Sequence, residues 1–334
     1  MSLDTEKIAS SVERDGITLI RNFISPELLE RIRIRLDELN QSEREAGIAF
    51  LESEGVNQRV FNLVNKGEVF EEIVQHPEVM KIMGRLLGGD CILSGFSSNT
   101  TGPGGEPMLL HSDSGYVPPP HPQYLLSANA IWILDDFTLE KGGTEYVPGS
   151  HLLRTNPDPR REYTCVPVVA PAGSLAILHG YTWHRTGANI SQNSRRRALF
   201  GYYVRPFLRV QENHLVSVRE EVWHRASPTL RHLLGGDLYL NSIGFMDGPP
   251  AEMRKLAFER RKDGGPWLRG PTRSRLTAHC GVNRERTAAH WHIIHRRIAT
   301  WSVDCSQAQV LDARSTRCDR ESDGALLLTI KKSD

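Results

Sequence analysis

The 334-residue chain is short of three features that would narrow its class at once: paired cysteines, long apolar runs and a net charge. Its cysteines are odd in number and form no C-x-x-C pair. The five are Cys91, Cys165, Cys280, Cys305 and Cys318. A disulfide framework is therefore not expected, and we predict free thiols in a reducing compartment.

The sequence also lacks an apolar run long enough to cross a bilayer, and residues 1–15 lack the apolar core of a secretory signal. We therefore expect a cytoplasmic protein without a membrane partner. The 41 Lys and Arg residues balance 40 Asp and Glu residues, which gives a formal net charge of +1. Such a balance provides no overall attraction to nucleic acid, so a nucleic-acid partner is not expected.

The first ninety residues carry helix signals. Residues 4–14 are amphipathic and predict a helix, and Ile17–Ile20 predicts a strand. Ser25 as N-cap with Pro26 at the first helical position predicts a helix that extends to about Leu39. A further helix is expected to begin after His76-Pro77 and to end at Gly88-Gly89.

From Cys91 onward the pattern changes to short apolar or alternating runs separated by Gly, Pro and Asn. The expected strands are residues 92–97, 108–113, 127–134, 144–147, 166–169, 174–178 and 196–204. Many short strands behind a helical layer predict a mainly β fold with flanking helices, namely a double-stranded β-helix or cupin-like jelly roll. We expect this domain to occupy residues 1–250.

Two histidines and one aspartate are the most informative residues. In an extended strand the side chains of residues i and i+2 point to the same side, so His111 and Asp113 can reach one metal ion. A third ligand must come from a distant strand, and His184 meets that need. This set is the 2-His-1-carboxylate face that holds Fe(II) and leaves other coordination positions open.

Several further motifs occur in a fixed order around these residues, and with them the chain resembles the phytanoyl-CoA dioxygenase family of Fe(II)/2-oxoglutarate-dependent oxygenases. The resemblance covers about residues 12 to 248. Its motifs are Arg14-Asp15-Gly16-Ile17, Ser25-Pro26-Glu27-Leu28, His111-Ser112-Asp113, Leu134-Asp135-Asp136, Gly142-Gly143-Thr144, Pro148-Gly149-Ser150-His151, His184-Arg185-Thr186-Gly187-Ala188-Asn189 and the arginines before Ala198-Leu199. Gly142 departs from the usual Asn of the family.

The resemblance implies Fe(II) as the metal, with 2-oxoglutarate and O2 as co-substrates and succinate and CO2 as products. It also favours His184 over His179 as the distal ligand, so that His179 is expected either to be buried with its hydrogen bonds satisfied or to support the metal ligands from behind. Family halogenases have a small residue at the carboxylate position, so Asp113 argues against halogenation. Hydroxylation of a small secondary metabolite is the favoured reaction, while desaturation, epoxidation and rearrangement stay open.

One arginine should bind the far carboxylate of 2-oxoglutarate. Counting from His184 indicates Arg195, whereas the register of the strand 196–204 indicates Arg196, which would share a face with Ala198, Phe200 and Tyr202. We favour Arg196, because strand register constrains side-chain direction more tightly than a loop count. Arg205 is a more distant candidate.

Other cofactor contacts are proposed by analogy with the family or by position. Thr144 and Thr186 are candidates for hydroxyl contacts to 2-oxoglutarate, although they are also ordinary strand residues. Trp132 either lines the cofactor side or packs in the core, and core packing is favoured. His151 is expected to form a local hydrogen bond. The loops 101–105 and 117–123 are expected to shape the substrate pocket.

Residues 251–334 form a basic extension, in which residues 254–297 hold twelve Lys and Arg against three Asp and Glu. We expect it to be solvated and partly disordered. Two alternatives to a small-molecule oxygenase follow: a protein or nucleic-acid hydroxylase that docks through this extension, and a non-catalytic cupin-like metal binder. A homodimer stays an open alternative, since the sequence does not determine the oligomeric state.

Overall fold

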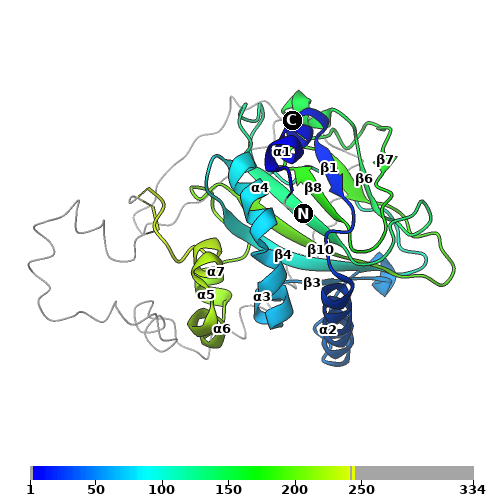
Figure 1. Cartoon of the computed structure of the whole chain (residues 1–334). Coiled ribbons are helices and arrows are strands. Elements are labelled where there is room, and N and C mark those ends of the chain that lie inside the picture. Colours follow the sequence, from blue (N-terminus) through cyan, green and yellow to red (C-terminus); the bar gives the residue numbers. More distant parts are fainter. Residues whose placement is uncertain (1–2, 241–242, 245–334) are drawn as a thin grey trace, which may run out of the picture. The chain divides into compact units, whose positions relative to one another are not determined.

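The structure is a computed structural model that describes residues 3–240 and 243–244. These residues belong to one compact unit, which holds all the elements shown in colour in Figure 1. The basic extension predicted for residues 251–334 lies outside the described residues, so the domain boundary at residue 250 stays a prediction.

Two antiparallel sheets form the centre of the fold. The larger has seven strands in the order β1-β8-β5-β10-β4-β3-β2, and the smaller has three in the order β7-β6-β9. The strands are β1 Ile17–Ile20, β2 Phe50–Glu52, β3 Asn57–Val60, β4 Ile92–Thr101, β5 Ser127–Ile133, β6 Thr144–Tyr146, β7 Val166–Pro167, β8 Leu175–His179, β9 His184–Thr186 and β10 Arg196–Val204. The mainly β prediction is therefore confirmed.

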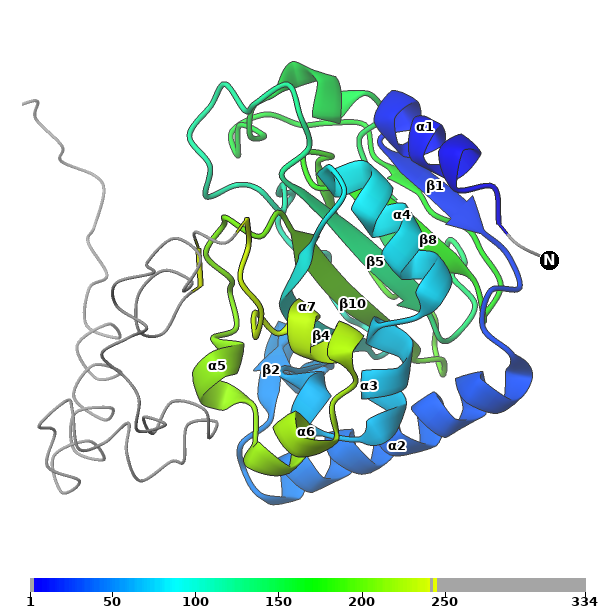
Figure 2. The same ribbon diagram turned by 60° about the vertical axis from the view of Figure 1, so that its left-hand side comes forward.

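Helices cover one face of the large sheet, as Figure 2 shows for α1, α3, α4 and α7 in front of β5, β8 and β10. The helices are α1 Thr5–Asp15, α2 Pro26–Glu45, α3 Glu68–Val74, α4 Pro77–Leu87, α5 His214–Ser217, α6 Glu220–Arg225 and α7 Pro228–Leu233. Within the described ranges, no helix has the length and apolar character that a membrane crossing requires.

The ends of α2 and α4 follow from local chemistry. The Ser25 hydroxyl accepts a hydrogen bond from the Leu28 amide at 3.2 Å, as expected of an N-cap. Gly88 ends α4 with φ of 88°, a left-handed conformation that glycine adopts without steric cost. Helix α2 continues to Glu45, six residues beyond the predicted end at Leu39. It does so because polar contacts replace the apolar stripe there: Asn40 donates to the Thr100 hydroxyl at 3.0 Å.

The alternation of side chains along β10 separates two hydrophobic cores. Leu199 and Tyr203 point to the helical side, where they pack in the larger core with Trp132. Arg196 and Ala198 lie in register on the opposite face, which faces the small sheet. The predicted direction of the β10 side chains is thus confirmed, and it determines which residues can reach the space between the sheets.

The predicted strand 108–113 is wrong. His111 forms an isolated bridge with His184, the Met108 amide donates to the Thr186 carbonyl at 3.0 Å, and Asp113 begins a turn. The apolar residues Leu109 and Met108 do not indicate a strand interior, because this segment lies along β9 at the edge of the small sheet and Leu109 is 87% exposed. Strands β2, β3 and β9 were not predicted, since each has three or four residues and no clear alternation.

Three buried histidines, His121, His151 and His179, lie near the end of β8. They are separate from the bridge between His111 and His184. The ring centroids of His151 and His179 lie 5.0 Å apart, and Tyr181 connects His179 to His121 at 5.0 and 4.7 Å. The expected local hydrogen bond of His151 is wrong: its Nε2 contacts the carbonyl oxygen of Glu13, 138 residues away, at 3.2 Å. The ring therefore ties helix α1 to the sheet.

This cluster predicts acid sensitivity. Burial lowers the pKa of His179 from 6.5 to about 3, so the unfolded chain binds a proton that the folded protein does not as pH falls below 6.5. His179→Asn keeps an acceptor for the Tyr181 amide but removes the titratable ring. Between pH 7 and pH 5 the free energy of unfolding should fall by about 2 kcal/mol less in this variant than in the wild type.

Urea denaturation followed by tryptophan fluorescence at the two pH values measures this difference. His224→Asn is the matched control, because the His224 side chain is 76% exposed. A His179→Asn variant with the same pH dependence as the wild type and the control would contradict the assignment.

Candidate metal centre

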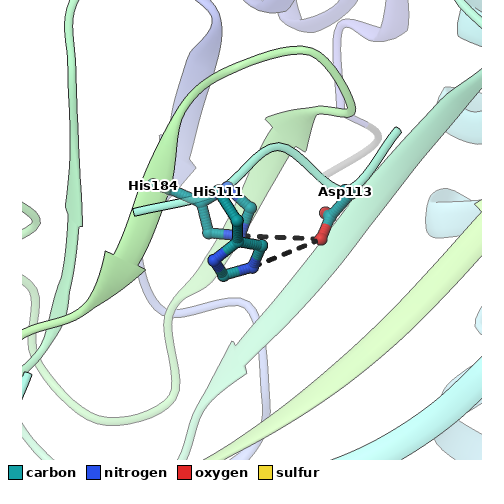
Figure 3. Close-up of side chains that lie close together, drawn as sticks. All are labelled: His111, Asp113 and His184. Atoms are coloured by element: carbon teal, nitrogen blue, oxygen red, sulfur yellow. Dashed lines mark ion pairs between the residues drawn. The ribbon is translucent and has the colours of Figure 1, made fainter. Parts of the chain in front are cut away.

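His111, Asp113 and His184 converge on one point, as the sequence predicts. Nε2 of His184 lies 3.6 Å from Oδ1 of Asp113, and Nε2 of His111 lies 4.0 Å from the same oxygen (Figure 3). The three potential ligand atoms lie within 4.8 Å of one another. Among the described residues this is the one group of three or more His, Cys, Asp or Glu side chains with such a geometry.

A backbone bridge places the two imidazoles side by side. The His111 amide donates to the His184 carbonyl at 3.0 Å, and the His184 amide donates to the His111 carbonyl at 2.8 Å. Residues paired in this way have neighbouring side chains on the same face, and the two rings are 4.4 Å apart. Asp113 follows in the turn that the Gly115 amide closes on the Ser112 carbonyl at 2.9 Å.

Both imidazoles present an unprotonated Nε2 to the centre. Nδ1 of His111 lies 3.0 Å from the Leu109 carbonyl, and Nδ1 of His184 lies 3.0 Å from the Thr182 carbonyl. A carbonyl can only accept, so Nδ1 carries the proton and the Nε2 lone pair is available to a metal ion. Burial also lowers the pKa of His184, which favours its neutral form.

The carboxylate of Asp113 is oriented by residues that the sequence reasoning did not identify. Asn129 on β5 donates from Nδ2 to Oδ2 of Asp113 at 3.2 Å, which leaves Oδ1 toward the imidazoles. The Tyr202 hydroxyl donates to the Asp113 backbone carbonyl at 3.0 Å and contacts the Tyr116 hydroxyl at 3.1 Å. Asn129 alternates with Ala128 and Ala130 along β5, and a polar residue in such an apolar strand was the available signal.

Two adjoining cavities share this centre. The inner chamber, of about 290 Å³, lies between the sheets and is lined by His184, Asn129, Thr144, Thr186 and Tyr202 among others. The outer chamber, of about 390 Å³, is lined by His111, Asp113 and Tyr116 with residues of β2 and β3. The predicted loops 101–105 and 117–123 line neither chamber. Residues of the β2–β3 hairpin, which was not predicted, line the outer chamber instead.

Arg196 is buried, and most of its hydrogen-bonding capacity is unused. It lies on β10 on the same face as Phe200 and Tyr202, which line the inner chamber. Its side chain has no exposed surface, Nη2 donates to the Gly142 carbonyl, and Cζ lies 5.0 Å from the centre of the Phe137 ring. Among the described residues, Nε and Nη1 have no hydrogen-bond partner. Burial, with Arg59 nearby, lowers the pKa of Arg196 to about 9, although the charge of Asp135 acts in the opposite direction. A buried cation without a direct ion pair fits a site for an anionic ligand such as a carboxylate.

The other two candidate arginines are engaged elsewhere. Arg195 is half-exposed and forms an ion pair with Asp37 on α2 at 2.6 Å. Arg205 donates from Nε to the Leu125 carbonyl at 2.6 Å and lies over the Tyr124 ring. The strand register therefore places Arg196, and neither of the alternatives, in the space between the sheets.

The two candidate threonines pair across the small sheet, Thr144 on β6 opposite Thr186 on β9, and both line the inner chamber. The Thr186 hydroxyl accepts from Nδ2 of Asn99 at 3.2 Å. Trp132 packs on the opposite face of the large sheet, where its ring lies 5.6 Å from Phe96 in the larger core. Its placement among the cofactor contacts is therefore wrong, and the alternative of core packing is confirmed.

His179 is separate from the metal centre, as the family spacing predicts. It is buried in the histidine stack, and its Nδ1 accepts from the Tyr181 amide at 3.1 Å. His184 rather than His179 reaches Asp113, because β9 crosses over to the small sheet after β8 ends at His179.

Comparison with known proteins matches residues 12–198 to the family Phytanoyl-CoA dioxygenase (PhyH). "Dioxygenase af480" of Aspergillus fumigatus is 30% identical over 252 residues, which cover 74% of this chain and 80% of that protein. "Dioxygenase andF" of Emericella variicolor is 27% identical, over 69% of this chain and 84% of that protein. The resemblance drawn from the motifs is therefore confirmed.

Solved structures share the fold. The non-heme alpha ketoglutarate dependent carbocyclase SnoK from nogalamycin biosynthesis superposes with a TM-score of 0.50 at 23% identity, over 60% of this chain and 84% of that one. HygX from Streptomyces hygroscopicus, with nickel and 2-oxoglutarate bound, gives 0.52 at 16% identity, over 61% and 88%. The predicted jelly-roll core is confirmed by this likeness.

Removal of one ligand should abolish tight metal binding. We expect Asp113→Ala to weaken Co(II) binding by more than the roughly 10- to 100-fold that loss of an outer hydrogen-bond partner costs. The fold should persist, because Asp113 lines a cavity instead of packing in a core. Isothermal titration with Co(II) measures the affinity and circular dichroism checks the fold. His224→Ala, at an exposed histidine, is the control, and unchanged Co(II) affinity in Asp113→Ala would contradict the site.

Loss of the Asn129 amide should have a smaller effect of the same kind. Asn129→Ala frees Oδ2 of Asp113 and should weaken Co(II) binding by roughly 10- to 100-fold. Asn129→Asp keeps the size but replaces the donor by a second carboxylate, and should not restore the wild-type affinity. Equal affinity for wild type and Asn129→Ala would show that this hydrogen bond does not orient the ligand.

Proposed function

Because this chain belongs to the phytanoyl-CoA dioxygenase family of Fe(II)- and 2-oxoglutarate-dependent oxygenases, we propose that it oxidises a C–H bond of a small secondary metabolite. Hydroxylation is the proposed outcome, with release of succinate and CO2. The observation that carries the proposal is the three-ligand metal face together with a buried guanidinium, that of Arg196, which has two unpartnered nitrogens among the described residues.

His111, Asp113 and His184 would hold the ferrous ion. Their ligand atoms approach from one side only, so the positions toward the inner chamber stay open to the co-substrates. When bound, ferrous iron with 2-oxoglutarate and O2 would supply the oxidising power, which no protein side chain provides. The protein supplies the ligand geometry, an anion site and the cavity around them.

Arg196 would bind the far carboxylate of 2-oxoglutarate. Two observations support this role: the guanidinium has unpartnered nitrogens among the described residues, and Arg196 shares a face of β10 with Phe200, which lines the inner chamber. Thr144 and Thr186 line the inner chamber, so their hydroxyls are proposed to contact the same co-substrate. The ion pair of Arg195 with Asp37 supports Arg196 over Arg195 in this role.

The carboxylate of Asp113 distinguishes between oxygen transfer and halogenation. Asp113 fills the ligand position that would otherwise be open to a halide, and Asn129 holds it there at 3.2 Å. We therefore favour transfer of oxygen to the substrate over halogenation. A secondary metabolite is favoured as the substrate because the fold is shared with a carbocyclase from nogalamycin biosynthesis and because the outer chamber has the size of a small-molecule site.

The direct test is co-substrate consumption. The purified full chain with Fe(II), 2-oxoglutarate and O2 should form succinate in response to members of a metabolite panel, and mass spectrometry should find the product 16 mass units heavier than the substrate. Chelation of the metal should stop both changes. Absence of succinate formation with every panel member, despite bound Fe(II), would favour a non-catalytic metal binder.

The two neighbouring arginines provide a matched pair. Arg196→Ala should raise the 2-oxoglutarate concentration for half-maximal succinate formation by about tenfold or more, because a charge-assisted hydrogen bond contributes roughly 1.5–3 kcal/mol. Arg196→Lys should lie between, since lysine keeps the charge but not the fork of donors. Arg195→Ala should change it little, because Arg195 pairs with Asp37 on the surface. Equal effects of the two alanine variants would contradict the strand-register assignment.

A further inference from the structure

Arg59 on β3 is a second arginine that faces the metal centre, and it lines both the inner and the outer chamber. Its side chain is only 19% exposed. It pairs with Asn99 of β4 in register, so it projects from the same sheet face as the residues beside Arg196. Arg59 is close enough to Arg196 to help lower the pKa of that group. Arg59 therefore adds a cation to the lining of both chambers, and the buried Arg196 lies near it without lining either one.

The guanidinium of Arg59 is only partly neutralised. Nε donates to Oε2 of Glu52 at 3.1 Å, and Nη2 lies against the Met108 sulfur, a weak acceptor, at 2.8 Å. The Nη edge therefore has no oxygen partner among the described residues. This arrangement leaves charge-assisted donors directed at a cavity, with a soft thioether in the place where an oxygen would bind more strongly.

The other charged groups of the two chambers are already occupied. Glu212 accepts from the backbone amides of Asn62 and Phe96 at 2.8 and 3.1 Å. Asp113 belongs to the metal face, and Arg185 forms an ion pair with Glu145 at 2.8 Å. Arg59 is thus the cation of the outer chamber that is available to a ligand, as far as the described residues are concerned.

Aromatic side chains form one part of the outer chamber, and the polar residues Glu52, Ser112 and Gln211 also line it. Phe50 and Phe61 meet edge to face with ring centroids 5.3 Å apart, and both are about half exposed although they are aromatic. Tyr116, 51% exposed, and Met108 line the same cavity. Flat aromatic surfaces around an open cavity favour a ligand with a rigid ring skeleton. Aromatic side chains and a rigid ligand lose little conformational entropy when they bury apolar area against each other.

We infer that the outer chamber binds a substrate with an apolar ring skeleton that carries one anionic oxygen, a carboxylate or an equally acidic enol, and that Arg59 binds this oxygen. The inference rests on the proposed function, because it assigns the substrate class of the same site. Phe50, Phe61 and Tyr116 would contact the rings. With the anion held at Arg59, the bound skeleton lies between β3 and the face of the metal centre formed by His111 and Asp113.

The test compares two probes that differ only in charge. 2-Naphthoate and 2-naphthamide are titrated anaerobically into the full chain loaded with Fe(II) and 2-oxoglutarate, with naphthalene fluorescence anisotropy as the readout. The wild type should bind the naphthoate about tenfold more tightly than the amide. Arg59→Gln should reduce naphthoate affinity to that of the amide and leave the 2-oxoglutarate affinity unchanged.

Two further variants separate the contributions. Arg31→Gln makes the same substitution at a surface ion pair on α2 and should leave both probe affinities unchanged. Phe61→Ser removes apolar surface and should weaken both probes by a similar factor. The ratio of the naphthoate affinity to the naphthamide affinity therefore measures the contribution of Arg59. A change that is equal for both probes measures the contribution of the aromatic side chains.

Three results would overturn the inference: no binding of either probe to the wild type, equal binding of both, or a charge preference that persists in Arg59→Gln. If Arg59→Gln instead weakens 2-oxoglutarate binding, Arg59 belongs to the co-substrate site and the inference is wrong. Because the titration needs no turnover, these results are distinct from failure of the proposed function, which shows as absent Fe(II)-dependent succinate formation by the wild type.

Discussion

The two-hydrogen-bond bridge between His111 and His184 is the interaction on which the metal centre depends. It joins residues 73 positions apart, and it sets both imidazoles on one face of the small sheet. Each Nδ1 is bound to a carbonyl two residues earlier, so the orientation of both rings follows from the backbone. The geometry of the two histidine ligands is therefore tied to the fold of the small sheet.

Strand β10 connects this centre to the rest of the molecule. On one face its side chains pack in the core beneath the helices. The other face carries Tyr202, which lines the inner chamber, and Arg196. Tyr202 contacts the backbone of Asp113, while Arg196 lies buried without a direct ion pair among the described residues. A buried unpaired cation is costly for a folded protein, and its presence is explained most simply by a ligand that supplies the missing anion.

The two chambers differ in the side chains that line them and therefore suit different ligands. The inner chamber offers the hydroxyl groups of Thr144 and Thr186 beside the metal face, and with the buried Arg196 on the same face of β10 as Phe200 it suits a small dicarboxylate. The outer chamber offers aromatic walls with the partly neutralised Arg59, which suits a larger apolar molecule. His111 and Asp113 line both, so the two ligands would meet at the metal.

The sequence by itself determined what depends on local pattern and on motif order: the helix ends at Ser25 and Gly88, the jelly-roll class, the three metal-ligand candidates and the direction of Arg196. Strand periodicity specifies the face of a side chain, which is why the choice of Arg196 over Arg195 was available without coordinates.

Only the tertiary structure decided which distant residues meet. Asn129, Tyr202 and Arg59 belong to three different strands, and nothing in their local sequence marks them as neighbours of Asp113. The wrong strand at 108–113, the misplaced Trp132 and the long-range contact of His151 have the same cause. Pairing across a sheet and packing between layers are set by the whole fold. Short strands such as β2 and β3 have too few residues for their sequence pattern to predict which strands they pair with.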